Sequence, residues 1–526
     1  MLQSDSMKER DVVLVAPNTL GSYKFKGKNR ENLALGVLSA YLSKEKIPSE
    51  LIDARLDHLN QQQVLNELVR LQPKVVGLTL MGQESALWSK DLTRLLKEEM
   101  PETHIIAGSY FPTLETQKCF TLLPELNSVA QGEGEETLIE LVFKIKNKSN
   151  WSDTRGIAFR QGDNIVVNPR RQLINNLDNL PFPTRYAEAE KISKASLEGS
   201  RGCFARCTFC SIGPHTDPIR SAWRGKSPQR IVKELTELRK IYPNIDQFRF
   251  LDDDFIGLGS NIERIKQLVN SLSSAGFSIN NSKLFFETQS RNVVSIPSEV
   301  WEKFHKVGLY QVFIGIETAS NKIKEKMIKP SDIETDIKAV QYLKDLGINT
   351  TYSIIMLTPW SDMDDVLKNV EMLKFLGDAG LDKYFSEMIL TPGTRAYEMV
   401  NSENKIYIEE FEGLGYYSFP LPDSLESIRK ISRFMLETHQ YRSFLEEIAS
   451  IYTQINALQL RGHLELASRL RKNLDEVNLE IFMKVINAVQ TNQCILNNLQ
   501  IENLLLNTIP FFKTKLSSIQ DHFKAK

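Results

Sequence analysis

The sequence predicts an α/β protein in three parts: an N-terminal doubly wound parallel sheet, an open (β/α)6 barrel and a helical C-terminal domain. Three patterns support this prediction. Short β-branched runs alternate with amphipathic stretches over residues 11–148, a second alternation follows from about residue 191, and only helical spacing remains beyond about residue 421. With 526 residues and 41% hydrophobic composition, the chain is long enough for about three domains with their own cores.

The first predicted domain, residues 1–150, alternates strands and helices in the order typical of a doubly wound parallel sheet. The predicted strands are Val12–Pro17, Ser49–Asp53, Val75–Leu80, His104–Gly108 and Ser128–Ala130. The predicted helices are Leu33–Lys46, Gln62–Leu71, Ala86–Glu99 and Glu135–Lys146. Residues 151–190 then form a predicted hairpin, with its turn at Gln161–Asn164, and a linker stiffened by Pro181 and Pro183.

The second predicted domain, residues 191–420, repeats the βα alternation. Its predicted strands lie near Ala195–Glu198, Gln247–Leu251, Lys283–Glu287, Gln311–Ile316, Thr350–Leu357 and Lys383–Leu390. Its predicted helices lie near Pro228–Ile241, Ile262–Ala275, Ser298–Val307, Ile333–Leu346 and Asp364–Leu376. Five helices between six strands favour a barrel of six units rather than eight. Residues 421–526 are predicted to be a helical domain.

The composition narrows the class of protein. Lys plus Arg (65) nearly cancel Asp plus Glu (66), so the net charge disfavours a nucleic-acid partner. No apolar run approaches the roughly 20 residues that span a bilayer, and no apolar signal-peptide core follows the polar Met1–Arg10 segment. We therefore expect a cytoplasmic protein without a membrane partner.

Three of the five cysteines lie within eight positions, in the segment GSRGCFARCTFC that ends at Cys210. In a reducing compartment this spacing indicates a metal or redox site, and Cys203, Cys207 and Cys210 can hold three of the four irons of a cuboidal cluster. A structural zinc ion is the alternative, with His215 as a fourth ligand. The two remaining thiols, Cys119 and Cys494, are predicted to be packing residues.

The motif C-x-x-x-C-x-aromatic-C after the first barrel strand resembles the signature of the radical S-adenosylmethionine (SAM) superfamily, with Phe209 as the aromatic residue. The resemblance implies a 4Fe–4S cluster whose open iron is chelated by SAM, and reductive cleavage of SAM to a 5′-deoxyadenosyl radical. It also implies cofactor contacts at Asp253 after the second strand, Arg291 after the third and Glu317 at the end of the fourth.

A doubly wound domain ahead of such a barrel resembles the subfamily with an N-terminal cobalamin-binding domain. The resembling phrases include the strand-end residues Gly108 and Gly132, where a glycine allows a large flat cofactor to approach the backbone. The D-x-H-x-x-G motif of cobalamin proteins that supply an axial histidine is missing, and the first histidine of the chain is His58. Many members of the subfamily lack it too, so the resemblance implies cobalamin as a third cofactor.

With cobalamin bound, the resemblance implies a radical methyltransferase that uses one SAM as methyl source and a second to remove a hydrogen atom from an unactivated carbon. The expected partners are a small-molecule or peptide substrate and an external one-electron reductant. Two rival reactions remain open: a radical SAM oxidoreductase or cyclase, and a peptide epimerase, each with an N-terminal domain that is only a scaffold. A non-catalytic zinc and cobalamin-binding protein is the remaining alternative. The catalytic residues beyond the cofactor sites are left unassigned.

Overall fold

The computed structural model describes residues 10–19, 30–216, 223–258, 261–377, 379–411, 414–492 and 495–524. Cys494 therefore lies outside the described residues. The chain divides into two compact units. The first unit contains Met1–Arg206, Cys210–Thr288 and Ile296–Val312, and the second contains Cys207–Phe209, Gln289–Ser295 and Phe313–Lys526.

The first unit opens with a sheet in the order β2-β1-β3-β4-β5-β6-β7. Its strands are β1 (Val12–Ala16), β2 (Ser49–Asp53), β3 (Val75–Thr79), β4 (His104–Gly108), β5 (Ser128–Ala130), β6 (Ile157–Gln161) and β7 (Asn164–Val167). The first five strands pair in parallel, and β6 and β7 add the predicted hairpin in antiparallel pairing. The predicted doubly wound sheet is confirmed, and its strand ends fall within one residue of their predicted positions.

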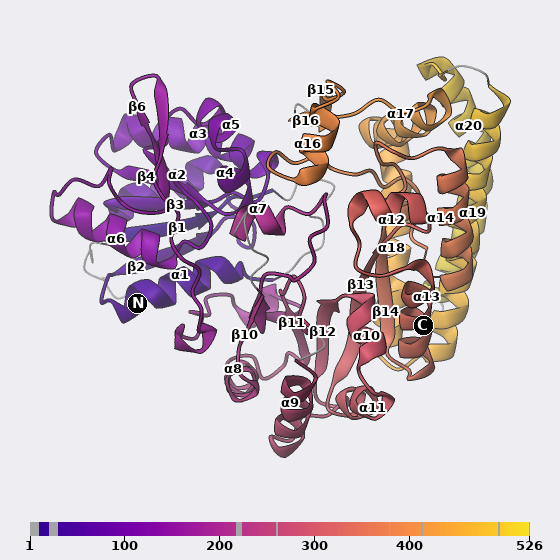
Figure 1. Ribbon diagram of the computed structural model, residues 1–526, viewed down its shortest axis with the longest axis horizontal. Coiled ribbons are helices and arrows are strands. Elements are labelled where there is room, and N and C mark those ends of the chain that lie inside the picture. The colour runs from indigo at the N-terminus through magenta and orange to yellow at the C-terminus, as the bar shows by residue number, and fades with distance from the viewer. Residues whose placement is uncertain are drawn as a thin grey trace. The chain divides into compact units, whose positions relative to one another are not determined.

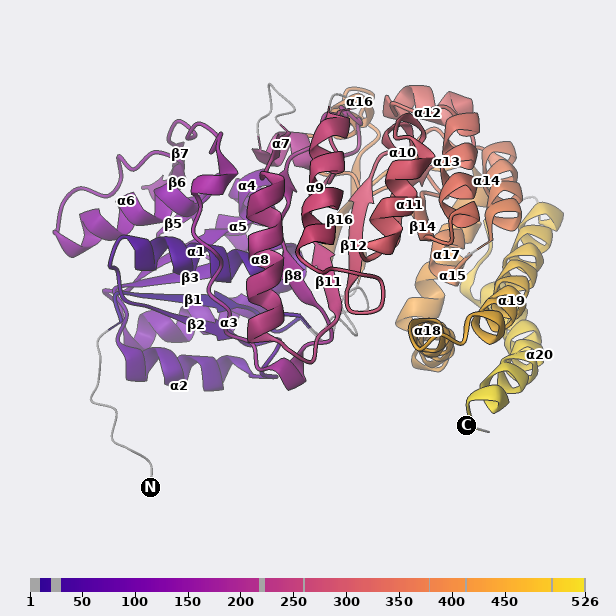
Figure 2. The same cartoon turned by 90° about the horizontal axis from the view of Figure 1, so that it is seen from below.

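Helices cover both faces of this sheet (Figure 2). They are α1 (Leu33–Lys44), α2 (Gln61–Leu71), α3 (Gln83–Glu99), α4 (Tyr110–Leu114), α5 (Thr116–Leu122) and α6 (Glu135–Lys146). Leucines of α2 and α3 pack on one face of the strands with Phe120, whereas α1 and α6 pack on the other. The caps are set by sequence, because Asn32 and Asn60 each accept backbone N–H groups at the starts of α1 and α2.

His104 ties β4 to β5 inside this domain. The ring is buried, its Nε2 lies 2.8 Å from the Ser128 hydroxyl, and its edge packs on Trp151. Burial, with the nearby Lys97, lowers the pKa of His104 from 6.5 to about 3. The imidazole is therefore neutral in the folded domain at physiological pH.

Because the unfolded chain takes up the proton near pH 6.5 and the folded domain does not, stability conferred by neutral His104 is lost as the pH falls from about 6.5 toward 3. At pH 5 we expect the opening free energy of β4 to be about 2 kcal/mol lower than at pH 7.5. Hydrogen exchange of the β4 amides at the two pH values measures this difference in opening free energy. The His104→Gln variant should lose most of this pH dependence, and an unchanged dependence would assign it to other groups.

The barrel sheet has the order β14-β13-β12-β11-β8, and the division between the two units falls within β13. Its strands are β8 (Ala195–Leu197), β11 (Gln247–Phe250), β12 (Lys283–Thr288), β13 (Leu309–Glu317) and β14 (Asn349–Ile354). The main helices between them are α8 (Pro228–Ile241), α9 (Ile262–Ser274), α11 (Ser298–Lys306), α13 (Ile333–Asp345) and α14 (Met363–Leu376). A short ribbon, β9 (Ser200–Arg201) with β10 (Arg224–Gly225), follows β8. These five strands confirm the predicted βα series.

The sixth predicted strand, residues 383–390, does not form as a strand. Helix α15 (Leu381–Tyr384) occupies its start, and one parallel bridge joins Leu357 to Glu387. Backbone hydrogen bonds flank this bridge at Leu357, but before it the hydroxyl of Ser386 takes the place of the backbone, because it accepts the Met356 N–H and donates to the Ile354 carbonyl. A side chain that competes with the backbone in this way shortens a strand, which β-propensity alone does not reveal.

The rest of the second unit is mainly helical, as predicted. The hairpin of β15 (Tyr407–Phe411) and β16 (Leu414–Ser418) precedes four helices: α17 (Asp423–Glu437), α18 (His439–Leu460), α19 (Leu464–Thr491) and α20 (Asn498–Lys524). Helices α19 and α20 run side by side (Figure 1). Short helices α10 (Ser290–Ser295), α12 (Asn321–Met327) and α16 (Arg395–Asn401) complete the unit. The predicted limits at residues 150, 190 and 420 stay predictions.

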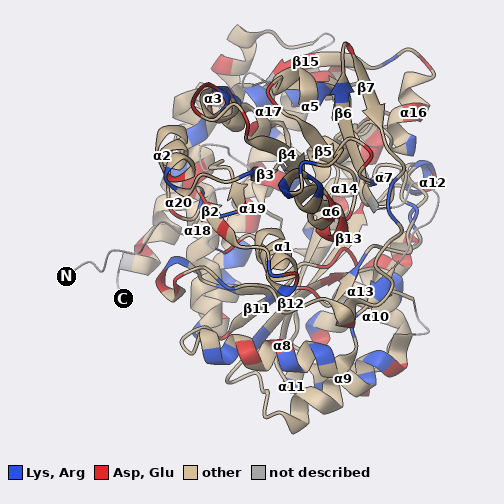
Figure 3. Cartoon of the chain, turned by 90° about the vertical axis from the view of Figure 1, so that its left-hand side faces the viewer, with Lys and Arg blue, Asp and Glu red and all other residues tan. Residues whose placement is uncertain are grey.

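Basic and acidic residues alternate along the ribbons of helices α8, α9 and α11, as the colouring of Figure 3 shows. This distribution agrees with the near balance of the two charge types in the sequence. Among the described residues, none of the helices combines the length and the apolar composition needed to cross a bilayer.

Candidate cofactor sites

The cysteine segment follows β8, the first barrel strand, as the sequence predicts, and the short strand β9, which was not predicted, lies between β8 and Cys203. Cys203 is buried and Cys207 and Cys210 are half-buried, and none of the three forms a disulfide. Gly202 has a φ of 78°, which favours glycine and turns the chain into the segment. Within the described ranges, no three His, Cys, Asp or Glu side chains are arranged to hold one metal ion. The assignment of a cluster to these thiols therefore depends on their spacing and on the family comparison below.

Thr208, in the middle of the segment, is fixed by backbone groups of the second unit. Its N–H donates to the Met327 carbonyl at 2.8 Å, its hydroxyl donates to the Lys326 carbonyl at 2.9 Å, and its carbonyl accepts the Ala396 N–H at 2.8 Å. The neighbouring Phe209 packs on the hydrophobic cluster that contains Met388 and Phe419. These contacts assign Phe209 a packing role in addition to the predicted cofactor contact, which stays a prediction.

Glu317, the predicted residue at the end of β13, has a φ of 71°. This strained backbone conformation is rare for a residue with a side chain and is concentrated at functional sites. One carboxylate oxygen accepts the Ser353 hydroxyl at 2.7 Å, and the other lies 3.5 Å from the Lys329 ammonium. The strand end thus holds a fixed carboxylate beside a cation.

Lys329 is a charged residue that the sequence analysis missed. Its side chain is only 2% exposed, and burial opposes its charge, yet Glu317 and Cys207 outweigh burial and raise the pKa of Lys329. Burial raises the pKa of the Cys207 thiol, and the Lys329 charge opposes that rise. A cation near a thiol favours the thiolate, which is the form that binds iron. Arg291, another of the predicted cofactor residues, lies half-buried in the first turn of α10.

The triplet Asp252–Asp254 after β11 divides into two roles. Asp252 accepts the Gly199 N–H and the Ser200 hydroxyl, so its carboxylate braces the chain ahead of the cysteines. Asp254 accepts the Thr288 hydroxyl, so its carboxylate joins this turn to the end of β12. Asp253 accepts the Gly202 N–H at 3.2 Å and lines a cavity. Burial raises the pKa of Asp253 to about 6, against the lowering effect of the Gly202 hydrogen bond.

That cavity, within the first unit, has a volume of about 340 Å³ and two kinds of wall. The first kind consists of strand ends and helices of the N-terminal domain, including Gly77, Gly108, Gly132 and the apolar side chains Leu14, Leu35, Ile106 and Leu138. The second comes from the barrel and includes Glu198, Arg201, Gly202, His215 and Asp253. Three predicted residues, Gly108, Gly132 and Asp253, are therefore brought together on one cavity.

The glycines of the N-terminal wall keep the cavity open. A Cβ on Gly77 would lie 2.7 Å from the Leu14 side chain, and Gly132 has a φ of 75°. A large cofactor with an apolar ring system and a rim of amides needs apolar surface beside a few polar groups. The cavity supplies both, so the residues present fit the cobalamin that the sequence predicts.

His215 and Tyr110 stack on each other in the cavity wall, with ring centroids 4.1 Å apart. Burial, with the nearby Arg170, lowers the pKa of His215 to about 4, and neither ring nitrogen has a hydrogen-bond partner. The sequence analysis considered His215 as a zinc ligand. The structure instead places its ring against a tyrosine of the N-terminal domain.

Two family models match the chain. The B12 binding domain matches residues 27–142, and the radical SAM superfamily matches residues 197–394. The first range contains Gly108 and Gly132, and the second contains the three clustered cysteines. Residues 197–394 therefore form a radical SAM domain, and residues 27–142 form a B12 binding domain ahead of the barrel. A radical SAM domain implies a 4Fe–4S cluster and SAM, and a B12 binding domain implies cobalamin.

Two relatives are similar over most of this arrangement. An uncharacterized methyltransferase of Pyrococcus horikoshii is 27% identical over 373 residues, which cover 68% of this chain and 77% of that protein. The 4′-phospho-dehydrooxetanocin synthase of Priestia megaterium is 28% identical over 347 residues, which cover 62% of this chain and 46% of that protein. The chain thus matches less than half the length of the synthase.

Among solved structures, the cobalamin-dependent S-adenosylmethionine radical enzyme OxsB, with aqua-cobalamin and SAM bound, superposes with a TM-score of 0.73 at 19% identity. The match covers 99% of this chain and 81% of OxsB. The likeness is one of fold, and it extends through the C-terminal helices, for which the sequence offered no resemblance.

Proposed function

We propose that this radical SAM enzyme methylates an unactivated carbon of a small-molecule or peptide substrate. In the proposal, SAM supplies both the methyl group and, through one electron from the cluster, the initiating radical, while cobalamin carries the methyl group. An external one-electron reductant supplies the electrons that the reaction consumes. The Pyrococcus horikoshii relative is named a methyltransferase, which supports this class of reaction.

A single observation carries the proposal: one cavity has walls from both the B12 binding domain and the segment that leads into the cysteines. Gly108 and Gly132 contribute on one side, and Arg201, Gly202 and Asp253 on the other. A cofactor held by the first wall faces the second. Reacting groups need near-contact distances. The group that carries the methyl must therefore come close to the same substrate atom that the radical attacks.

The assigned roles follow from the contacts of each residue. Cys203, Cys207 and Cys210 hold three irons and leave the fourth for SAM. Glu317 accepts hydrogen bonds from SAM while Ser353 keeps its carboxylate in place. Asp253, half-buried and hydrogen-bonded to the Gly202 N–H, is placed to accept a donor of either cofactor. Arg291 is assigned to SAM on its position after β12 alone.

A second candidate function keeps the radical but transfers no methyl group. The Priestia megaterium relative is named a synthase rather than a methyltransferase, which favours a reaction without methyl transfer. The epimerase alternative needs a thiol that returns a hydrogen atom to the substrate. Cys119 is fully buried in the core of the N-terminal domain, so no substrate can reach it and it is not available as that donor.

Product analysis distinguishes the candidates before any substrate is known. The chain, reconstituted anaerobically with iron and sulfide, is incubated with SAM and titanium(III) citrate, with or without hydroxocobalamin. Methyl transfer from SAM releases S-adenosylhomocysteine, whereas reductive cleavage releases methionine and 5′-deoxyadenosine. We expect 5′-deoxyadenosine in both samples and S-adenosylhomocysteine only when cobalamin is present.

If cobalamin is retained and 5′-deoxyadenosine forms without S-adenosylhomocysteine, the methyltransferase proposal is wrong and the second candidate replaces it. If neither product forms in a sample that contains the full iron complement, the radical SAM assignment itself is contradicted. The non-catalytic alternative predicts bound zinc and no iron.

A further inference from the structure

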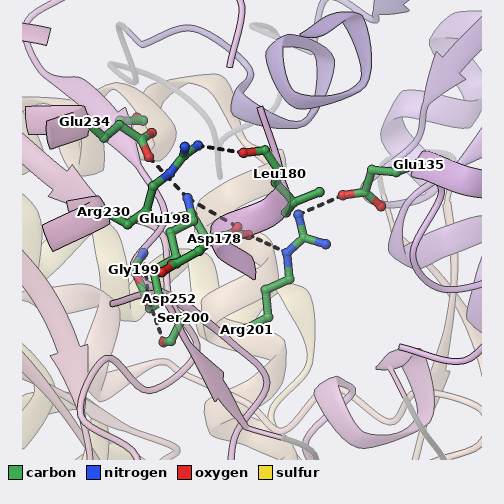
Figure 4. Close-up of polar contacts among 12 residues, drawn as sticks. Glu135, Asp178, Leu180, Glu198, Gly199, Ser200, Arg201, Arg230, Glu234 and Asp252 are labelled. Carbon is green, nitrogen blue, oxygen red and sulfur yellow. Dashed lines mark hydrogen bonds and ion pairs between the residues drawn. The ribbon is translucent and has the colours of Figure 1, made fainter. Parts of the chain in front are cut away.

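A set of buried charges connects the N-terminal domain to the cysteine segment. The Arg201 guanidinium lies 3.2 Å from Glu133, 2.7 Å from Glu135 and 2.8 Å from Glu198. Figure 4 shows it reaching Glu135 on one side and Glu198 on the other. Glu133 and Glu135 follow β5 of the N-terminal sheet, whereas Glu198 ends the first barrel strand. One side chain therefore contacts the edges of both domains.

These charges are withdrawn from water. The exposed fraction is 14% for the Arg201 side chain, 11% for Glu133 and 6% for Glu135. Removing one partner of a buried ion pair leaves an uncompensated charge, which is strongly unfavourable. The planar guanidinium donates hydrogen bonds to Glu198 and Glu135 while it forms an ion pair with Glu133, and an ammonium on a flexible stem does not reproduce this arrangement. The geometry is thus specific to arginine.

Arg201 also lies where its position affects both cofactor sites. It lines the cavity, and it stands two residues before Cys203. The β9–β10 ribbon pairs it with Arg224, whose guanidinium also lies 2.9 Å from Glu133. A shift of this guanidinium would move the β5–α6 segment relative to the cysteine segment.

We propose that Arg201 is a positioning residue that fixes the cobalamin-binding edge of the N-terminal sheet against the cysteine segment. This role rests on the proposed function, because the proposed methyl transfer is the step that requires the two cofactors to be aligned. Arg201 acts through Glu133, Glu135 and Glu198 rather than on the reacting atoms.

Arg185 provides a matched control. Its guanidinium is 5% exposed and also joins the two domains, lying 2.6 Å from Glu31 and 3.2 Å from Glu234. It does not belong to the cavity lining. Arg201→Lys and Arg185→Lys therefore make the same chemical change in buried inter-domain ion pairs, but only the first lies at the cavity. Thermal unfolding of both variants shows whether each remains folded.

Two measurements test the role. Hydrogen exchange without cobalamin should become faster in residues 131–137 and 198–204 for Arg201→Lys, and stay at the wild-type rate there for Arg185→Lys. With SAM, hydroxocobalamin and titanium(III) citrate, the ratio of S-adenosylhomocysteine to 5′-deoxyadenosine should fall about tenfold or more for Arg201→Lys alone, because a shift of about 1 Å is costly for transfer.

The role is overturned if both variants give the wild-type ratio, if both lower it equally, or if Arg201→Lys loses cobalamin or iron, since it would then hold a cofactor rather than align two. Failure of the proposed function has a different signature. In that case the wild-type chain itself forms no S-adenosylhomocysteine, and the alignment role falls with it.

Discussion

Replacing Cys207 with alanine should reduce the iron content of the reconstituted chain from full occupancy to below about one tenth, because three thiolates are the protein's whole contribution to such a cluster. Formation of 5′-deoxyadenosine from SAM should fall to the level of a protein-free control. Iron and sulfide analysis, together with the visible absorption of the cluster, measures the first effect. Chromatography of the SAM products measures the second.

Cys119 supplies the matched control for this loss. It is a fully buried thiol in the core of the N-terminal domain, so Cys119→Ala removes a sulfur at a cost of about 1 kcal/mol of stability without touching the cysteine segment. This variant should keep its iron and its product formation. Full iron occupancy in Cys207→Ala would contradict the cluster assignment.

Gly108→Leu should weaken binding of hydroxocobalamin roughly 100-fold, equivalent to about 2.7 kcal/mol, because the new side chain extends into the space the cofactor needs. Gly108 lines the cavity at the end of β4, and a Cβ there would make an ordinary contact, 3.7 Å from Ala130. The backbone therefore tolerates a side chain, and the loss comes from the filled cavity. Retained cobalt after gel filtration, or an absorbance titration, measures the affinity.

A size series separates filling from misfolding. Gly108→Ala adds only the Cβ that the structure accommodates, so it should bind within about threefold of the wild-type affinity. Both variants should keep the wild-type iron content, since the cysteine segment is unchanged. Equal affinity for Leu, Ala and the natural glycine would place cobalamin outside this cavity.

The parts of the fold that the sequence predicts correctly depend on short-range patterns. Alternation of β-branched runs with helical spacing located β2, β4, β5 and α6 at their observed bounds, and Ser227–Pro228 marked the start of α8. The cysteine spacing likewise predicted the radical SAM domain that the family comparison shows. Each of these signals involves residues fewer than about twenty positions apart.

The errors involve contacts between residues that are distant in sequence. The predicted strand at residues 383–390 failed because Ser386 takes over hydrogen bonds of a strand thirty-odd positions earlier. Arg201 was not singled out, because its partners Glu133 and Glu135 belong to another domain. Lys329 was missed although Glu317 lies only 12 positions before it, because nothing local marks a lysine that approaches a strand end. Arg291 and Glu317 were placed by strand position, and their cofactor contacts stay predictions.

The most direct test of the central claim is the metal content of the whole chain. Protein purified anaerobically, reconstituted with iron and sulfide, incubated with hydroxocobalamin and desalted is analysed for iron, sulfide, zinc and cobalt. We predict iron and sulfide sufficient for one four-iron cluster, with cobalt equimolar to the chain. Zinc in place of iron, or a complete cluster without retained cobalt, would contradict a radical SAM enzyme that uses cobalamin.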